Sequence, residues 1–278
     1  MNTIVRNETE EIIKLYINGI STKKLARKYQ CSDSLISKII KENNIQMRTA
    51  SQRTQKYSIN ENAFGAITEE SAYWIGFLMA DGCIKTAKGI SRTVALEITE
   101  SDKNHIEKFR DFLKSNHKIS FRQLNDKRNG WENSKPLIGI SFCNQQIIKD
   151  LALFGVVPAK SKIAKVQHLE NHKDFWRGLI DGDGCITSIH KGRLSSIEIG
   201  GSRELLQQFS EYVGNFIFKH KSNVRLSSKC INFYKITFSG SSASKIIEHL
   251  YKNVNIFLDR KYKRANHVMM TGNGYYGN

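Results

Sequence analysis

The sequence Trp74-Ile75-Gly76-Phe77-Leu78-Met79-Ala80-Asp81-Gly82 returns about a hundred residues later as Trp176-Arg177-Gly178-Leu179-Ile180-Asp181-Gly182-Asp183-Gly184. Cys-Ile follows the last glycine of both copies. The apolar residues fall at helical spacing, and each copy ends in Asp-Gly. The chain is therefore predicted to contain two buried helices, each with a carboxylate at its C-terminal end.

Small residues form a stripe along each predicted helix. Gly76 and Ala80 are four positions apart, and Gly178 and Gly182 occupy the equivalent positions. Residues at this spacing lie on one helix face, so two such stripes allow two helix backbones to approach closely. Packing along the stripes would bring the carboxylates at the two helix ends side by side.

Such a pair of carboxylates is unfavourable unless a cation binds between them. A helix C-terminus carries partial negative charge, and two nearby carboxylates repel each other. A divalent cation offsets both effects, so Asp81 and Asp183 indicate a metal-dependent enzyme. We also expect Gly82 and Gly184 to end the helices in the left-handed conformation, which other residues adopt only at a cost.

The similarity between the two halves extends beyond these helices. Leu96-Glu97-Ile98 matches Ile197-Glu198-Ile199, and the alternating stretch 138–142 matches 234–238. Each half is predicted to run helix, strand, strand, helix, strand, strand, helix. A period of this length fits two related subdomains rather than a solenoid. We expect three domains, at residues 1–57, 69–167 and 172–268.

The charge of the chain points to a polyanionic partner. Lys and Arg number 43 against 26 Asp and Glu, for a net charge of +17 and a pI near 9.6. An excess of this size favours nucleic acid binding. The five cysteines are scattered without a Cys-x-x-Cys pair, which argues against a zinc site and a disulfide framework. No apolar run is long enough for a membrane span, and residues 1–8 do not resemble a signal peptide. We therefore expect a cytoplasmic protein of a bacterial or phage-infected cell, with an organelle left open.

Residues 1–57 are predicted to form a separate unit of three short helices. The first spans 10–17 and ends at Gly19, the second spans 22–29 after the cap Ser21, and the third follows the cap Ser32. This pattern resembles the helix-turn-helix of resolvases and phage regulators, which implies that the last helix lies in the major groove. A helical bundle without a ligand also fits it. The expected DNA contacts are Ser34, Ser37, Lys38 and Lys41 on that helix and, along the phosphate backbone, Arg48 and Arg53 in the basic linker that follows.

From Glu69 to His267 the chain resembles a single-chain LAGLIDADG homing endonuclease, because two copies of the motif stand at subdomain spacing. The resemblance implies an α+β fold in which two pseudo-symmetric αββαββα subdomains pack through their motif helices, after a small all-α helix-turn-helix domain. It also implies that Asp81 and Asp183 bind divalent metal, with Gly82 and Gly184 beside them. Asp181 is left out of the metal site, because Met79 takes its place in the first copy.

A basic residue late in each subdomain belongs to the active site of this family. Lys160 and Lys261 match that position, and Lys162 and Lys263 are near competitors. The resemblance implies a double-stranded DNA endonuclease that acts as a monomer. It would use Mg²⁺, for which Mn²⁺ should substitute, and would cut both strands across the minor groove to leave 3′ overhangs.

The outer faces of the two sheets are expected to read the DNA in the major groove. The first half contributes the candidates Lys85, Lys88, Arg92, Arg122, Gln123 and Arg128, and the second half contributes Thr187, His190, Lys191, Arg193, Arg225 and Lys229. Two other functions stay open: a DNA-binding regulator without catalysis, and an intron maturase that binds its own intron RNA. The presence of both aspartates and both lysines argues against the regulator.

Overall fold

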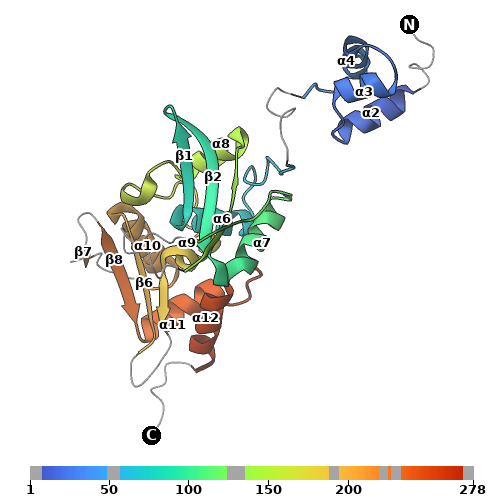
Figure 1. Cartoon of the computed structure of the whole chain (residues 1–278). Coiled ribbons are helices and arrows are strands. Elements are labelled where there is room, and N and C mark those ends of the chain that lie inside the picture. Colours follow the sequence, from blue (N-terminus) through green and yellow to red (C-terminus); the bar gives the residue numbers. More distant parts are fainter. Residues whose placement is uncertain are drawn as a thin grey trace. The chain divides into compact units, whose positions relative to one another are not determined.

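In the computed structural model, the described residues are 8–48, 57–123, 135–187, 194–218, 225–226 and 233–271. The chain divides into two compact units, Met1–Tyr57 and Ser58–Asn278. Each has its own hydrophobic core, and we describe each by itself (Figure 1). No helix in these described ranges is long and apolar enough to cross a membrane.

The first unit consists of three short helices, as predicted. They are α2 (Thr9–Ile17), α3 (Thr22–Lys28) and α4 (Asp33–Glu42). Gly19 follows the first helix with a φ of +97°, while Ser21 and Ser32 accept hydrogen bonds from the backbone N–H groups of Lys24 and Leu35 and so cap the next two helices. The helices enclose a small core made of Ile12, Tyr16, Leu25, Ala26, Ile36, Ile39 and Ile40.

The second unit contains the two predicted halves, and both have the order αββαββα. The first half is α6 (Glu69–Ala80), β1 (Gly82–Ala87), β2 (Ile90–Thr99), α7 (Lys103–Phe112), β3 (Ser120–Arg122), β4 (Leu137–Phe142) and α8 (Gln145–Leu153). The second half is α9 (Lys173–Asp183), β5 (Cys185–Thr187), β6 (Ser196–Gly201), α10 (Arg203–Phe216), β7 (Arg225–Leu226), β8 (Tyr234–Ser239) and α11 (Ser241–Tyr251).

The two sheets have the same topology. The strand orders are β1-β2-β4-β3 and β5-β6-β8-β7, with antiparallel pairing throughout. Short 3₁₀ helices lie at Glu100–Asp102 (η1) and Lys160–Lys162 (η3), and one further helix, α12 (Asp259–Thr271), follows the second half. The predicted α+β fold of two related subdomains is therefore confirmed.

The helices α6 and α9 lie side by side between the sheets of the two halves (Figure 1). Their backbones touch at the two motif glycines. A Cβ atom added at Gly76 would lie 2.0 Å from the carbonyl oxygen of Phe175, and one added at Gly178 would lie 2.0 Å from that of Tyr73. An alanine at either position would force the helices apart, at a cost of about 1–3 kcal/mol or more of folding free energy.

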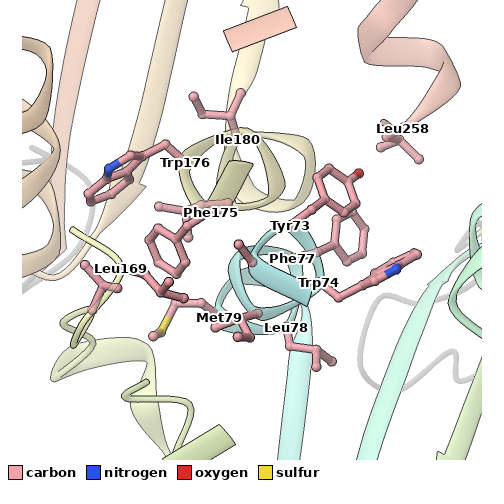
Figure 2. Close-up of a cluster of buried hydrophobic side chains, with 14 of the residues drawn as sticks. Tyr73, Trp74, Phe77, Leu78, Met79, Leu169, Phe175, Trp176, Ile180 and Leu258 are labelled. Carbon is pink, nitrogen blue, oxygen red and sulfur yellow. The ribbon is translucent and has the colours of Figure 1, made fainter. Parts of the chain in front are cut away.

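Large aromatic side chains surround this contact. Trp74 and Trp176 point to opposite sides of the helix pair (Figure 2), where each packs against the amphipathic helix of its own half. Trp74 lies 4.8 Å, ring centre to ring centre, from Phe109 on α7, and Trp176 lies 5.1 Å from Phe209 on α10. Both tryptophans and Tyr73 are fully buried, and this confirms that the two motif helices are buried.

The predicted conformation of the glycines that follow the motif helices was wrong. Neither Gly82 nor Gly184 has a positive φ, and Gly184 is extended at φ −79°. These positions need glycine for lack of space. A Cβ added at Gly82 would lie 2.6 Å from the carbonyl oxygen of Leu78, and one added at Gly184 would lie 2.8 Å from that of Ile180. At both positions the chain passes so close to the last helical turn that only glycine fits.

Candidate active site

The two motif aspartates stand at the C-terminal ends of the paired helices. Asp81 caps α6 and donates its backbone N–H to Phe77, and Asp183 is the last residue of α9. A Cβ atom added at Gly182 would lie 3.3 Å from Asp81 Oδ2 and 2.2 Å from the Cβ of Ala80. The close packing of the helices thus places the carboxylate of one half against the helix end of the other.

Two buried lysines reach the same place from separate segments. Lys160 lies in η3 and donates from its Nζ to the carbonyl oxygen of Gly82. Lys261 lies in α12 and donates to the carbonyl oxygens of Ile180 at 2.6 Å, Gly182 at 2.8 Å and Gly184 at 2.7 Å. Both ammonium groups therefore donate to backbone carbonyls at or directly after a helix C-terminus, where the helix carries partial negative charge.

The four charged groups influence one another. The pKa of Asp81 is raised to about 6, mainly by burial and also by the charge of Asp183, while the nearby lysines and Arg260 oppose the shift. Burial also raises the pKa of Asp183, against Lys160 and Lys261. For the lysines the direction reverses: burial lowers the pKa of Lys160, and lowers that of Lys261 to about 8, against the aspartates. The aspartates and lysines form one electrostatic cluster.

The two carboxylates are free to bind a cation. Both side chains reach solvent, and among the described residues no hydrogen bond or ion pair engages either carboxylate. No group of three or more His, Cys, Asp and Glu side chains within the described ranges could hold a metal ion. A cation at this place would therefore take Asp81 and Asp183 from the protein and fill its shell with water or phosphate oxygens.

That Gly82 and Gly184 lie at the metal site stays a prediction. The only groups a glycine can offer are those of its backbone, and the carbonyl oxygens of both residues accept hydrogen bonds from Lys160 and Lys261. Each carbonyl oxygen has two lone pairs, so the bond to a lysine leaves room for a second ligand.

The remaining acidic residue of the motif faces inward. Asp181 is fully buried, and both of its carboxylate oxygens are engaged by hydrogen bonds from Tyr73, Tyr251 and the backbone N–H of Leu258. Its omission from the metal site agrees with this environment. Of the two competing lysines, Lys263 is exposed on α12, and the side chain of Lys162 lies outside the described residues.

Several predicted DNA-contacting residues lie on the outer faces of the sheets. Lys85 and Thr187 are exposed on β1 and β5, and Lys88 is exposed in the turn between β1 and β2. Arg122 on β3 is exposed and pairs with Glu97 at 2.7 Å. Exposed ion pairs of this kind are weak, so Arg122 stays able to bind a phosphate. Gln123 follows it, also exposed.

Other predicted contacts fall outside the described part of the chain. These are Arg53, Arg128, His190, Lys191, Arg193 and Lys229, together with the side chains of Arg92 and Arg225.

In the first unit, the outward face of α4 is polar and basic. Ser34, Lys38 and Lys41 are exposed, and Ser37 is half-buried. Arg48 differs from its expected role as a phosphate contact. Its guanidinium group stacks on the ring of Tyr16 at 4.2 Å and donates to the carbonyl oxygens of Gly19, at 2.8 Å, and Ile20. Arg48 therefore holds the chain after α4 against the rest of the unit.

Two groups of residues near the site were not found from the sequence. Arg177 on α9 is fully buried, pairs with Asp174 at 2.5 Å and donates to the carbonyl oxygen of Ile256 at 2.9 Å. At the start of α12, Asp259 pairs with Lys108 on α7 and Arg260 pairs with Asp102 in η1, both at 2.8 Å. Arg177 and Asp181 stand where the first motif has Ile75 and Met79, and this asymmetry was the available signal.

Comparison with known proteins supports the family resemblance over the second half of the repeat. Residues 170–251 match the model of the LAGLIDADG-like domain, which confirms the resemblance for α9 through α11. No curated protein matches the chain. Similar solved structures include the LAGLIDADG meganuclease I-CpaMI bound to uncleaved DNA, with a TM-score of 0.48 and 11% identity over 74% of this chain and 92% of that one. Another is I-AabMI bound to uncleaved DNA, with a TM-score of 0.47 and 13% identity over 74% and 91%.

The raised pKa of Asp81 predicts how the metal-free protein responds to pH. Because the folded state binds the proton more tightly than the unfolded state, stability falls as pH rises from about 4 through 6. Asparagine carries no proton to lose, so the variant Asp81→Asn should not show this fall in stability. We expect the variant to unfold at higher urea concentration than the wild type above pH 6, and the difference to shrink below pH 4.

The matched control is Asp111→Asn, at an aspartate that is 76% exposed; it should leave the urea midpoint unchanged across the same pH range. All titrations contain a chelator. A lower urea midpoint for Asp81→Asn than for the wild type at pH 7.5 would contradict this expectation. It would show that the charged carboxylate of Asp81 does not destabilise the folded protein.

Proposed function

Because the chain carries a LAGLIDADG-like domain over residues 170–251, we propose that it is a DNA endonuclease that depends on a divalent metal and hydrolyses both strands of a specific double-stranded target. The observation that carries this proposal is the cluster at the paired ends of α6 and α9. Asp81 and Asp183 lie there with side chains that reach solvent and have no partner among the described residues. Two buried lysines, Lys160 and Lys261, lie beside them.

Asp81 and Asp183 would hold the metal. Their oxygen ligands suit Mg²⁺, and Mn²⁺ should substitute. The bound cation supplies activation of water and neutralisation of charge on the phosphate and the leaving oxygen. The electrostatics of the site support this assignment, because burial disfavours the charge of each carboxylate and raises its pKa, and the charge of Asp183 adds to this effect at Asp81. A cation relieves that cost, whereas Asp181 and Asp174 have their charges satisfied inside the protein.

Lys160 and Lys261 would act on the reacting phosphates, one for each strand. An ammonium group held at the helix end can stabilise the negative charge that develops during hydrolysis, or orient the attacking water. With its pKa lowered to about 8, Lys261 can also exchange a proton near neutral pH. Each lysine contacts the helix end of its own half, which supports the assignment of one lysine to one strand.

The DNA would lie across the two sheets, with α6 and α9 beneath the minor groove where the cuts are made. A net charge of +17 supplies the attraction to the phosphate backbone. Cleavage across the minor groove would leave short 3′ overhangs. Lys85 and Thr187, exposed on the first strand of each sheet, suit contacts to base edges in the flanking major grooves.

The first unit would add contacts beside this segment. Residues 1–57 hold 11 Lys and Arg against 5 Asp and Glu, a net charge of +6, and α4 presents Ser34, Lys38 and Lys41 outward. A helix-turn-helix that places α4 in the major groove explains this face better than a helical bundle without a ligand, which needs no basic surface.

Cleavage of a DNA library tests the proposal. The wild-type protein is incubated with randomised target duplexes and Mg²⁺, and the cut ends are sequenced. We expect double-strand cuts at a defined sequence. Asp81→Asn and Asp183→Asn should each abolish the cuts, by about 10³-fold or more, and keep the affinity for the selected target.

A regulator without catalysis would bind a sequence from the same library and cut none, with Mg²⁺ or with Mn²⁺. Binding of the intron RNA with no DNA cut would favour a maturase. Normal cutting by either aspartate variant would remove the assignment of the active site.

Deletion of residues 1–57 tests the role of the first unit. The second unit should still fold, because the backbone of Ser58 and Asn60 is bonded within it, to Asn116 and Leu113. We expect weaker binding, a smaller dependence of affinity on salt and a footprint shortened on one side, because phosphate contacts are lost. The cut position should not move.

Single substitutions in the full chain provide a matched pair. Lys41→Gln on α4 should weaken binding of the target, whereas Lys14→Gln on α2, which removes the same charge from another helix, should not. A footprint of unchanged length after the deletion would show that the first unit does not contact the target.

A further inference from the structure

A buried hydrogen-bond network surrounds Asp181, a residue for which the proposed reaction has no use. Tyr251 donates to Asp181 Oδ1 at 2.7 Å, while Tyr73 and the backbone N–H of Leu258 donate to Oδ2 at 2.7 and 2.8 Å. His105 meets the hydroxyl of Tyr73 at 3.0 Å. A fully buried carboxylate is costly unless it is paired in this way, so the network needs a purpose other than core packing.

The network leads directly to Lys261. Leu258, whose N–H is held by Asp181, precedes α12, and its carbonyl oxygen accepts the backbone N–H of Lys261 at 2.9 Å. Through its N–H and its carbonyl oxygen, Leu258 thus connects the carboxylate of Asp181 to the first turn of the helix that carries Lys261. From there Nζ of Lys261 returns to the carbonyl oxygens on either side of Asp181, those of Ile180 and Gly182.

The first half of the molecule fixes the same turn from the other side. Asp259 pairs with Lys108 on α7, and Arg260 pairs with Asp102 in η1, both at 2.8 Å. These ion pairs are partly exposed and weak by themselves. The fully buried bonds to Asp181 therefore contribute most to holding the start of α12.

The other lysine has no comparable support. Met79 stands where Asp181 stands in the second motif, and Lys160 lies in a 3₁₀ turn of three residues that follows Ala159 at a φ of +54°. Within the described residues its Nζ has one acceptor, the carbonyl oxygen of Gly82, whereas Lys261 has three. The two halves share a fold and hold their lysines differently.

We propose that Asp181 is a positioning residue for Lys261, so that cleavage of one strand depends on the Asp181 network and cleavage of the other does not. This inference rests on the proposed function for its consequence in cleavage, but its structural part can be tested without DNA. Four variants probe the network and its equivalent position, and Lys261→Ala serves as the reference for the lysine itself. Asp181→Leu removes the acceptor, and Met79→Leu is the control at the equivalent position of the first half.

The other two variants separate this role from general stability. Tyr251→Phe removes one donor from the same buried network and leaves the bond between Asp181 and Leu258 intact, so it should not affect Lys261. If Asp181→Leu alone fails to fold, the triple variant with Tyr73→Phe and Tyr251→Phe replaces it, because it no longer buries two hydroxyl donors without an acceptor.

The first readout is chemical modification of the lysines in the free, full-length protein, followed by mass spectrometry. A buried, fully bonded ammonium group reacts only when its surroundings open. Asp181→Leu or the triple variant should raise the modification rate of Lys261 by about tenfold or more and leave that of Lys160 unchanged. Unchanged protection of Lys261, or equal exposure of both lysines, overturns the proposal.

The second readout is the rate of cleavage of each strand of the selected target, labelled separately. Lys261→Ala identifies the strand that this lysine serves. Asp181→Leu should slow that same strand by about tenfold or more, since misplacement of about 1 Å can cost this much, and leave the other strand within about twofold. Nicked product should accumulate.

Equal slowing of both strands would show that Asp181 acts only through overall stability, and an effect of Tyr251→Phe as large as that of Asp181→Leu would show the same. If the wild type cuts no DNA, the proposed function fails, and the modification rates still decide whether Asp181 positions Lys261.

Discussion

At Gly76 and Gly178 the backbones of α6 and α9 come so close that a Cβ atom on either glycine would overlap the carbonyl oxygen of the other helix. This contact determines where every other part of the second unit lies. It joins the two halves, directs Trp74 and Trp176 to opposite sides of the helix pair, against α7 and α10 (Figure 2), and brings the C-terminal ends of both helices together. Two carboxylates that would otherwise avoid each other are thereby held at one place.

The same constraint explains why the site contains buried lysines. Paired helix ends concentrate unsatisfied carbonyl groups and negative charge. Lys160 and Lys261 satisfy several of these carbonyls and partly offset the charge of the aspartates. The carboxylates remain without internal partners among the described residues. An arrangement that gives lysine donors to these carbonyls and leaves two acids free is suited to a cation that arrives from solution.

Features that depend on local spacing could be predicted from the sequence. The small residues four apart predicted the helix contact, and the alternating strands predicted two sheets of the same order. Features that depend on distant partners could not. A sequence does not distinguish a glycine needed for its φ from one needed for space, as at Gly82 and Gly184. Nor does it show that Arg48 meets Tyr16, or that Tyr73, Tyr251 and Leu258 all reach Asp181.

The central claim is that packing of α6 against α9 creates one cation site between Asp81 and Asp183. The most direct measurement is an anomalous difference map from crystals of the full-length protein grown with a DNA duplex and Mn²⁺. We expect manganese between the two carboxylates, with Lys160 and Lys261 still bonded to the helix ends, and no peak there in crystals of Asp183→Asn. Manganese bound elsewhere, with the two aspartates unoccupied, would contradict the claim.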